Sequence, residues 1–568
     1  MIVDFIVQNM APIMFAALVV VLLLGYPVAF SLAFVGLSFG LLGIWLGLFS
    51  PNFFGVLPER MWAIMSNETL LAIPFFTFMG LILERSGMAE DLLDTIGQLF
   101  GPVRGSLAYA VIFVGALLAA TTGVVAASVI AMGLISLPIM LRYGYDRRLA
   151  AGVISASGTL AQIIPPSLVL IVMADQLGRS VGDMYEGAFI PGILLAVLYA
   201  VYVLIVTIVR PGAAPALPPE ARTLGSGVTS LFVAVAGAVL VGILATYALE
   251  GRMQGPEVGG FVVAVAAACL FALVNQTLKL DLLSRLAQQT IVVLMPPLAL
   301  IFLVLGTIFI GLATPTEGGA MGAVGALLLA AAKGRLTLRL VKQALDSTAR
   351  LSAFVLFILV GARVFSLTFY GVNGHLWVEQ FLIDLPGGQL GFLVFVNVLV
   401  FVLAFFLDFF ELAFIVVPLL GPVAEKLGID LIWFGVILGI NMQTSFMHPP
   451  FGFALFYLRS VAPRSPYLDK VTRAPIQPVT TAQIYWGAVP FVCIQLIMVG
   501  LAIQFPQMIM HYKASHPVID PSTIQIPLPP AAGGTELGQP PDLSQPPDLS
   551  QPPDLGQPPD LSQPPSFD

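Results

Sequence analysis

The sequence has few charged residues for its length. Lysine, arginine, aspartate and glutamate make up 10% of its 568 residues, whereas a soluble domain carries about 25%. Hydrophobic residues make up 58% of the chain, and the mean hydropathy is +0.97. So small a polar fraction cannot cover the water-facing surface of a soluble protein of this size. We therefore expect much of the surface to face lipid.

Cysteine is also scarce. The two cysteines, Cys269 and Cys493, both lie in apolar stretches, and we interpret them as small core residues. This excludes a disulfide framework and a cysteine-based metal site as organising features. The metalloprotease pattern H-E-x-x-H is absent, and no chain of intramembrane lysine and glutamate suits a proton relay. We therefore do not expect an enzyme.

Long apolar runs, by contrast, recur throughout the chain. A run of about 20 residues crosses a hydrocarbon core of about 30 Å as a helix, because backbone polar groups must be paired internally there. The sequence predicts an all-α polytopic membrane protein, with the first apolar run retained as a helix. The expected spans are 8–25, 27–48, 70–84, 149–175, 188–209, 228–249, 258–277, 289–312, 318–333, 351–371, 431–458 and 484–510.

Two further apolar stretches, 105–140 and 389–424, are too long for one span. The first is interrupted by Thr121-Thr122-Gly123 and the second by Asp408-Phe409-Phe410-Glu411. Each stretch is therefore two spans or one re-entrant hairpin, which is tolerated only where protein or a watery cavity covers it. Both alternatives return the chain to the same side.

The basic residues predict the orientation. Loops containing Arg142, Arg210, Lys279, Lys333 and Arg459 with their basic neighbours fall on one side, which the positive-inside rule assigns to the cytoplasm. Both termini are then expected in the periplasm.

When the sequence is compared with itself at one constant shift, proline, glycine and aspartate residues of the first half coincide with identical residues of the second half. Pro138 coincides with Pro422, Gly144 with Gly428, Asp146 with Asp430, and Pro165-Pro166 with Pro449-Pro450. Because the two sets begin on opposite sides, we expect an inverted repeat, which places a substrate site between the halves near the midplane.

The expected organisation follows from these boundaries. Scaffold helices occupy 1–104, a first transport half 105–209 (hairpin 105–140, broken helix 149–175), a linker with an extra helix pair 210–288, second-repeat scaffold helices 289–388, and a second transport half 389–510 (hairpin 389–424, broken helix 431–458). The remainder, 511–568, contains repeated QPPDL units and is expected to be a disordered spacer.

Polar residues surround both Pro pairs at membrane depth. Two prolines remove two backbone donors, so upstream carbonyls are freed and, with nearby hydroxyls, could bind a hard cation such as Na⁺. The half-helix that follows presents its positive end to a carboxylate. Alternatively, the hydroxyls only bond to helix carbonyls and the prolines only bend the helix. Candidate substrate-binding residues are Ser157, Thr159, Gln443, Ser445 and Arg363; Arg363 could instead snorkel.

A histidine beside the second Pro pair and a short bend near the N-terminus are two further features. His448 is a candidate proton site, although its imidazole could simply bond to freed carbonyls. Gly25-Tyr26-Pro27 predicts a bend between helices and no further role.

Four segments, 70–88, 143–167, 311–320 and 427–452, resemble the large, DctM-type membrane subunit of tripartite ATP-independent periplasmic (TRAP) transporters, within the ion-transporter superfamily. The resemblance implies an elevator carrier of the bacterial inner membrane with two re-entrant hairpins and two broken helices. It implies Na⁺ as coupling ion with no other cofactor. It also implies a separate small four-helix membrane subunit and a periplasmic solute-binding protein that delivers an organic acid; no nucleic acid is expected.

The same resemblance implies two Na⁺ sites. Thr121, Thr122, Gly158 and Pro165 lie around one, and Asp408, Asn441, Thr444 and Pro449 around the other. The family usually has Gly-Ser-Ser at the first hairpin tip, where this chain has Thr-Thr-Gly. The alternative transport function is a stand-alone Na⁺- or H⁺-coupled dicarboxylate carrier of the same superfamily, and a membrane enzyme is the alternative from another class.

Overall fold

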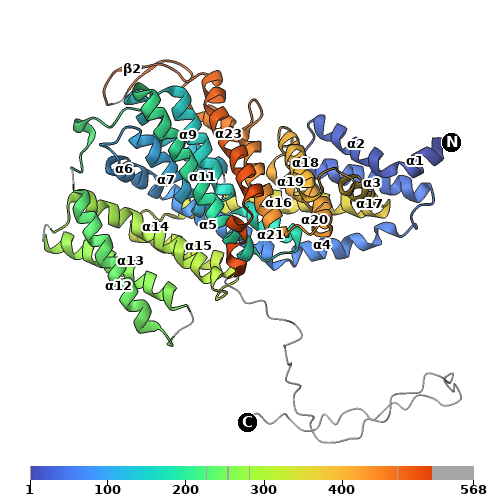
Figure 1. The fold of residues 1–568 in the computed structure, drawn as a ribbon, viewed down its shortest axis with the longest axis horizontal. Helices are drawn as coiled ribbons and strands as arrows, with labels where there is room; N and C mark the ends of the chain where they lie inside the picture. The colour runs from blue at the N-terminus through green and yellow to red at the C-terminus, as the bar shows by residue number, and fades with distance from the viewer. Residues whose placement is uncertain are drawn as a thin grey trace, which may run out of the picture. The chain divides into compact units, whose positions relative to one another are not determined.

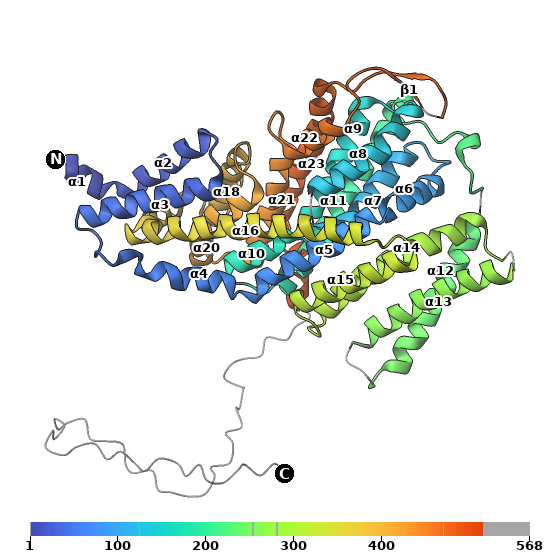
Figure 2. The same cartoon turned by 180° about the vertical axis from the view of Figure 1, so that it is seen from behind.

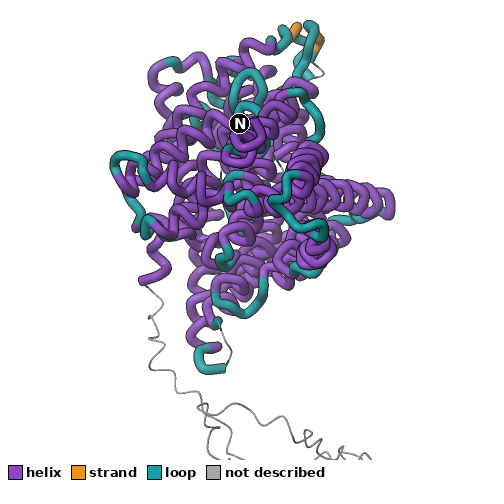
Figure 3. The backbone as a smooth tube through the Cα atoms, turned by 90° about the vertical axis from the view of Figure 1, so that its right-hand side faces the viewer, coloured by secondary structure: helices purple, strands orange, loops and turns teal. Residues whose placement is uncertain are grey.

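The computed structural model describes residues 2–123, 125–225, 227–252, 255–279, 282–469 and 471–514. Most of these residues are helical, and one pair of two-residue strands is the only sheet in the described ranges (Figure 3). Eight helices are long and apolar enough to cross a membrane, and two bent helix pairs also qualify when each is taken as one span. The predicted all-α polytopic fold is confirmed. The QPPDL tail lies outside the described residues.

The chain up to residue 209 forms the first series of helices. These are α1 (Ile2–Gln8), α2 (Met10–Leu23), α3 (Val28–Trp45), η1 (Phe53–Val56), α4 (Leu57–Met65), η2 (Glu68–Leu71), α5 (Ala72–Arg85), α6 (Met88–Leu99), α7 (Ser106–Thr122), α8 (Val125–Arg142), α9 (Arg147–Thr159), η3 (Leu160–Gln162), α10 (Leu168–Leu177) and α11 (Val181–Val209).

The second series follows a connector. It comprises η4 (Pro211–Ala213), η5 (Pro219–Ala221), α12 (Val228–Leu249), α13 (Pro256–Leu278), α14 (Arg285–Phe309), α15 (Pro315–Ala332), α16 (Leu338–Gly371), α17 (Gly374–Ile383), α18 (Gly388–Leu403), α19 (Phe409–Ile415), α20 (Val417–Lys426), α21 (Leu431–Met442), η6 (Gln443–Phe446), α22 (Phe453–Val461), β1 (Tyr467–Leu468), β2 (Pro475–Ile476), α23 (Thr481–Gln504), α24 (Gln507–Met510) and η7 (His511–Ala514).

The two series repeat the same order of elements at the predicted offset, the one that relates Pro138 to Pro422. The second arm of the first hairpin, α8, begins at Val125, and its counterpart α19 begins at the equivalent position, Phe409. The broken helices obey the same offset, because α9 begins at Arg147 and α21 at Leu431. In each, a 3₁₀ turn (η3 or η6) precedes the Pro pair and a second helix (α10 or α22) follows it. The coincidence of element boundaries therefore supports a structural repeat.

The residues that coincide in sequence also have equivalent structural roles. Asp146 accepts hydrogen bonds from two backbone N–H groups in the first turn of α9, at 2.8 and 3.1 Å, and Asp430 does the same in α21 at the same two distances. Gly144 and Gly428 precede these caps with φ of +79° and +72°, a left-handed conformation that favours glycine. Both Pro–Pro peptide bonds are cis.

The two hairpins enter from opposite ends of the long helix α11. The backbone N–H of Asp146, at the base of the first hairpin, donates to the Ala213 carbonyl just beyond the end of α11, at 2.8 Å. At the base of the second hairpin, Glu425 pairs with Arg179, just before the start of α11, at 2.9 Å. α11 has 29 residues and is therefore about 43 Å long. The hairpins consequently have opposite orientations, as an inverted repeat requires.

Each half packs against the hairpin of the other half. Helix α10, which follows the first break, packs against α19 and α20, and α22, which follows the second break, packs against α8. Helix α9 also packs closely on α23 (Figure 1). A Cβ atom added to Gly152 would lie 2.1 Å from the Gly487 carbonyl oxygen, so this crossing requires glycine. The two hairpins and the two broken helices therefore form one interlocked group.

The remaining helices surround this group. Helix α16 packs against α3, α4 and α5 (Figure 2), and α5 packs against α15. The spans predicted at 228–249 and 258–277 are observed as α12 and α13, which pack on each other and on α14 (Figure 1). Only 6% of the apolar window of α12 is buried. The rest of the chain therefore buries few residues of this helix completely.

Several predicted boundaries differ from the observed ones. The span predicted at 70–84 continues an upstream segment, 53–65, with a 47° bend. The span predicted at 351–371 is the end of the 34-residue α16, which begins at Leu338 with a polar, basic segment. Helices α6 and α17 were not predicted, because α6 is amphipathic and α17 is only 10 residues long. Hydropathy alone detects neither kind of helix.

Candidate functional site

A cavity of about 670 Å³ lies where the two hairpin tips meet the scaffold helices. The first half contributes residues of the tip and of the break, including Gly123, Val125 and Gln162. The second half contributes its tip, including Asp408 and Glu411. The loop between α2 and α3, the start of α3, and helix α16 form the remaining wall. Tips that enter from opposite ends of α11 and line one cavity favour the hairpin alternative over two spans each.

The tip of the first hairpin is a glycine turn. Gly123 ends α7 with φ of +58°, and its N–H donates to the Ala119 carbonyl at 3.3 Å. This left-handed helix ending is typical of glycine. Thr121 and Thr122 form the last turn of α7, but their side chains are outside the described part of the structure. Their backbone places them next to the cavity-lining Gly123.

The tip of the second hairpin carries two acids that form a capping box. The Asp408 carboxylate accepts from the Glu411 N–H at 2.9 Å, and the Glu411 carboxylate accepts from the Asp408 N–H at 2.8 Å. Both side chains are half-buried and line the cavity. The box organises the start of α19. Each carboxyl group keeps a second oxygen free of this box, so the tip presents acidic side chains to the cavity.

Around the first Pro pair a serine satisfies one of the freed carbonyls. Pro165 and Pro166 have no N–H, so the carbonyls of Ala161 and Gln162 lack their helical donors. The Ser167 hydroxyl donates to the Gln162 carbonyl at 2.5 Å and accepts from the Val169 N–H at 3.2 Å. Ser167 thus joins the two halves of the broken helix and caps the second.

Around the second Pro pair an asparagine pair ties the break to the hairpin. The Asn441 amide donates to the backbone and side-chain oxygens of Asn397 on α18, at 2.7 and 3.0 Å. The His448 ring is buried and stacks on Phe405 with a centroid distance of 4.1 Å. The second broken helix is therefore linked to its own hairpin through side chains.

Buried polar atoms without hydrogen-bond partners gather at both breaks. Within the described residues they include the Ser157 hydroxyl and the Gln162 amide oxygen in the first half. In the second half they include the Asn441 amide oxygen and both polar atoms of the Gln443 amide. All four side chains are at most 1% exposed. Buried polar groups without partners are rare and indicate a bound ion, water or ligand.

Three predicted hydroxyls instead bond to helix carbonyls three residues earlier. The hydroxyls of Thr159, Thr444 and Ser445 donate to the carbonyls of Ala156, Asn441 and Met442 at 2.8, 2.7 and 2.7 Å. This agrees with the alternative interpretation that they support the break locally. Their oxygen lone pairs stay available to a cation.

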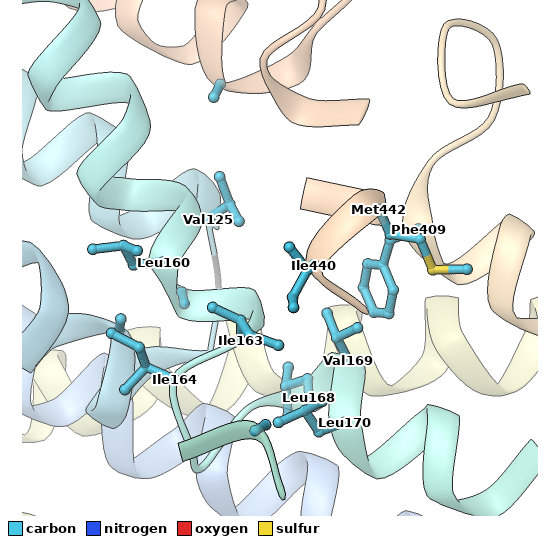
Figure 4. Close-up of a cluster of buried hydrophobic side chains, with 14 of the residues drawn as sticks. Val125, Leu160, Ile163, Ile164, Leu168, Val169, Leu170, Phe409, Ile440 and Met442 are labelled. Atoms are coloured by element: carbon cyan, nitrogen blue, oxygen red, sulfur yellow. The ribbon is translucent and has the colours of Figure 1, made fainter. Parts of the chain in front are cut away.

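Apolar side chains separate the two breaks from each other (Figure 4). Ile163 and Leu168 of the first break lie near Ile440 and Phe409 of the second half. All four are buried. Among the predicted site residues with described side chains, Asp408 lines the cavity, whereas Gly158, Pro165, Asn441 and Gln443 do not. In this conformation the polar side chains of the breaks thus lie behind the cavity wall, except for Gln162, which lines the cavity.

None of the five predicted substrate-binding residues lines the cavity, and two of them, Thr159 and Arg363, have other neighbours. Thr159 lies next to Gln495 of α23, whose amide also donates to the Tyr199 hydroxyl at 3.0 Å. Arg363 lines a separate pocket of about 140 Å³ with Arg60 and Asn67. The structure therefore does not bring either residue to the cavity formed by the hairpin tips.

Sequence reasoning missed part of the cavity wall. Gly25, Tyr26 and Pro27, interpreted only as a bend, line the cavity together with Phe354 and Phe357 of α16. The aromatic pair on α16 gave no signal, because phenylalanine in an apolar span is ordinary. The bend itself was visible, but its position next to the second hairpin tip depends on packing.

One motif match does not form a catalytic site. Residues 36–40 read G-L-S-F-G and fit the nucleophile pattern G-x-S-x-G. That pattern works at a sharp strand-to-helix turn, whereas these residues lie inside the helix α3. They therefore lack the geometry that exposes a nucleophilic serine.

Comparison with known proteins gives a consistent family match. Residues 15–508 match the model of the family described as "Tripartite ATP-independent periplasmic transporter, DctM component". The C4-dicarboxylate TRAP transporter large permease protein DctM of Pseudomonas aeruginosa is 28% identical over 415 residues, covering 73% of this chain and 82% of the relative.

Other relatives carry different substrates in their names. The sialic acid TRAP transporter large permease protein SiaM of Vibrio cholerae is 25% identical, covering 85% of this chain and 93% of its own length. The ectoine TRAP transporter large permease protein TeaC of Halomonas elongata is 24% identical, covering 89% and 99%. The solved structure of the Alcanivorax borkumensis YdaH transporter gives a TM-score of 0.48 at 15% identity, over 80% of this chain and 89% of that chain.

Proposed function

Since this chain belongs to the DctM component family of tripartite ATP-independent periplasmic transporters, it is the large permease subunit of a transporter, and we propose that it couples uptake of an organic carboxylate to Na⁺. One observation carries the proposal. Two inverted hairpins bring their tips to a single cavity, and both charged residues that line it, Asp408 and Glu411, are acidic. A carboxylate entering such a cavity needs a cation to balance the charge. Na⁺ bound by oxygen ligands near the tips supplies it.

The unpartnered polar atoms support two ion positions. Ser157 and Gln162 offer oxygens at the first break, and Asn441 and Gln443 offer them at the second. Hard cations prefer such oxygen ligands. We propose that Na⁺ at these positions is lost or gained as the breaks open toward the cavity.

An elevator movement fits the division of the cavity wall. One wall belongs to the interlocked group of hairpins and broken helices, and the other to α2, α3 and α16. We propose that the interlocked group slides as one body along the scaffold. The remaining partners would be a small membrane subunit and a periplasmic solute-binding protein, as the family implies.

The charge distribution supports an orientation in the inner membrane. The base of the first hairpin lies beside Arg142, Arg147, Arg148 and Arg210, a cluster that the positive-inside rule places in the cytoplasm. Both termini are then periplasmic. Accessibility of a cysteine introduced by Ala514→Cys, compared with one introduced in the loop near Arg210, would check this assignment in a background without the two native cysteines.

Uptake into proteoliposomes tests the whole proposal. The permease and its small subunit are reconstituted, and labelled organic acids are offered with or without the cognate binding protein and an inward Na⁺ gradient. Uptake that requires both the binding protein and Na⁺ is the expected result. Uptake without the binding protein would instead indicate a stand-alone carrier, and uptake driven equally by a proton gradient would contradict Na⁺ coupling.

A further inference from the structure

The wall of the substrate cavity is aromatic on both sides. Phe354 of α16 meets Phe410 of α19 edge to face, with centroids 6.1 Å apart. Phe30 of α3 meets Phe357 of α16 in the same manner at 5.2 Å. All four rings line the cavity. Aromatic rings stabilise apolar and aromatic ligands through area burial and ring contacts.

The cavity wall has few polar side chains, and its charged side chains are all acidic. Of the described residues that line the cavity, none is lysine, arginine or histidine. Apart from the acids Asp408 and Glu411, its polar side chains are Tyr26, Gln162 and Tyr457. A dicarboxylate would bring a second negative charge close to the two acids, with no basic side chain among these residues to pair with it, which is strongly unfavourable in a desolvated site. A polyhydroxylated acid would bring more hydroxyl groups than these side chains can satisfy.

Gln162 offers a handle for one carboxylate. Its side chain is 1% exposed, it lines the cavity, and its amide oxygen has no hydrogen-bond partner. The nitrogen of the same amide can donate to a carboxylate. Gln162 belongs to the first break, whereas the rings of Phe409 and Phe410 stand at the opposite hairpin tip. The cavity thus has an amide on the side of the first break, whereas the second tip contributes both these rings and the acids Asp408 and Glu411.

From these observations, and resting on the carrier function proposed above, we propose that the cavity selects a monocarboxylate with an apolar, preferably aromatic body, and rejects dicarboxylates and polyhydroxylated acids. The carboxylate lies at the Gln162 end with its charge balanced by the coupling cation. The body lies among the four rings of Phe30, Phe354, Phe357 and Phe410.

Ligand binding to the purified complex of the permease and its small subunit tests this selectivity without the binding protein. Thermal stabilisation in Na⁺ buffer is measured with phenylpyruvate, 4-methyl-2-oxovalerate, succinate and N-acetylneuraminate. We expect phenylpyruvate to stabilise most, 4-methyl-2-oxovalerate less, and the other two not at all. Stabilisation by succinate or N-acetylneuraminate in place of phenylpyruvate would overturn the proposal.

Uptake of the same four acids into proteoliposomes distinguishes a failure of the proposed selectivity from a failure of the proposed carrier function. Na⁺-driven uptake of succinate without phenylpyruvate uptake would leave the carrier function standing and refute the selectivity. Failure to bind or transport any organic acid, with an intact complex, would refute the carrier function and the selectivity together.

Two phenylalanines on one helix provide a matched pair of variants. Phe30 and Phe34 both lie on α3 and are 60% and 62% exposed, but of the two only Phe30 lines the cavity. Phe30→Ala should weaken phenylpyruvate binding about tenfold and affect 4-methyl-2-oxovalerate less. Phe34→Ala should leave both affinities unchanged. Equal effects of the two variants, or no effect of Phe30→Ala in a complex of normal thermal stability, would contradict the aromatic wall.

Discussion

The two halves of the repeat differ most at their Pro pairs and hairpin tips. Pro165 and Pro166 are buried and Ser167 caps the helix after them, whereas Pro449 is half-buried, Pro450 is exposed, and no side chain caps α22. At the tips the contrast is one of charge. Asp408 and Glu411 of the second half correspond, at the offset of the repeat, to Val124 and Ala127 of the first.

This difference separates two tasks that the repeat performs. The shared backbone plan, with its caps, breaks and hairpins, builds a symmetric framework around one cavity. Acidic side chains are present at only one of the two tips. The framework is thus present twice, and the pair of acids once. Substitutions at equivalent positions of the two halves should therefore have unequal effects on uptake or on stability.

The largest expected effect is at the charged tip. Asp408→Asn keeps a good helix-capping side chain but removes the negative charge. Apparent Na⁺ affinity in proteoliposome uptake should fall at least about tenfold, because an interaction with a charged group contributes about 1.5–3 kcal/mol. Asp384→Asn, at an exposed site outside the cavity, is the control. If correctly inserted Asp408→Asn keeps the Na⁺ dependence of the wild type, the charge of Asp408 does not contribute to Na⁺ binding.

A second test compares position 443 with its counterpart 159. Gln443 has two buried, unpartnered polar atoms, whereas the Thr159 hydroxyl is satisfied. Gln443→Leu should raise the melting temperature, because a buried unsatisfied amide costs about 1–3 kcal/mol, and should reduce Na⁺-driven uptake about tenfold. Thr159→Val should reduce uptake less. A more stable Gln443→Leu transporter with full uptake would mean that the amide holds no ion or substrate.

The ends of the hairpins offer a third comparison. Arg142 ends α8, its counterpart Lys426 ends α20, and each forms an ion pair. Arg142 pairs with the 2% exposed Asp469, whereas Lys426 is 55% exposed in its pair with Glu379. Arg142→Gln should destabilise the protein by about 1–3 kcal/mol and Lys426→Gln by less than about 1 kcal/mol, measured by thermal unfolding in detergent. Equal losses of stability in the two variants would show that the two ion pairs contribute equally to the fold.

The Arg142 effect should also be independent of pH over a wide range. Burial raises the pKa of the Asp469 carboxyl, but hydrogen bonds from the Thr472 N–H and hydroxyl and from Arg142 outweigh it and lower the pKa to about 2. A lowered pKa stabilises the fold above the unfolded value near 4 and loses this effect as the pH falls toward 2. The difference between wild type and Arg142→Gln should thus stay constant from about pH 7 to about pH 4.

The smallest expected effect lies outside both halves. Ending the chain after Lys513 removes the QPPDL units but keeps the ion pair of Lys513 with Asp430. Uptake and melting temperature should be unchanged, because a proline-rich spacer contributes no core. Loss of transport by a correctly inserted truncated protein would show that the tail has a specific role.

Much of the framework was predictable because its causes are local or periodic. Apolar runs predicted the helices, proline pairs predicted the breaks, and the constant offset between matching residues predicted the repeat. The capping roles of Asp146 and Asp430 follow from their positions just before helices. Helix α6, the bend before α5 and the length of α16 escaped prediction, because polar residues interrupt the hydropathy there.

The candidate site was only partly predictable for a different reason. Asp408 was identified because a charge at membrane depth is conspicuous. The places of Thr159, next to Gln495, and of Arg363, beside Arg60, depend on which face of a helix meets which neighbour. A residue's depth along a helix can be counted in the sequence, but its direction depends on packing.

By itself, the sequence determined the membrane environment, the duplicated order of elements and the two breaks, because each depends on composition or on prolines within one segment. Only the tertiary structure decided that the two tips meet in one cavity, that its far wall is aromatic, and that Gln162 reaches the cavity while Asn441 and Gln443 do not. Those features join segments that are far apart in the chain, and the packing between such segments is not encoded in any local pattern.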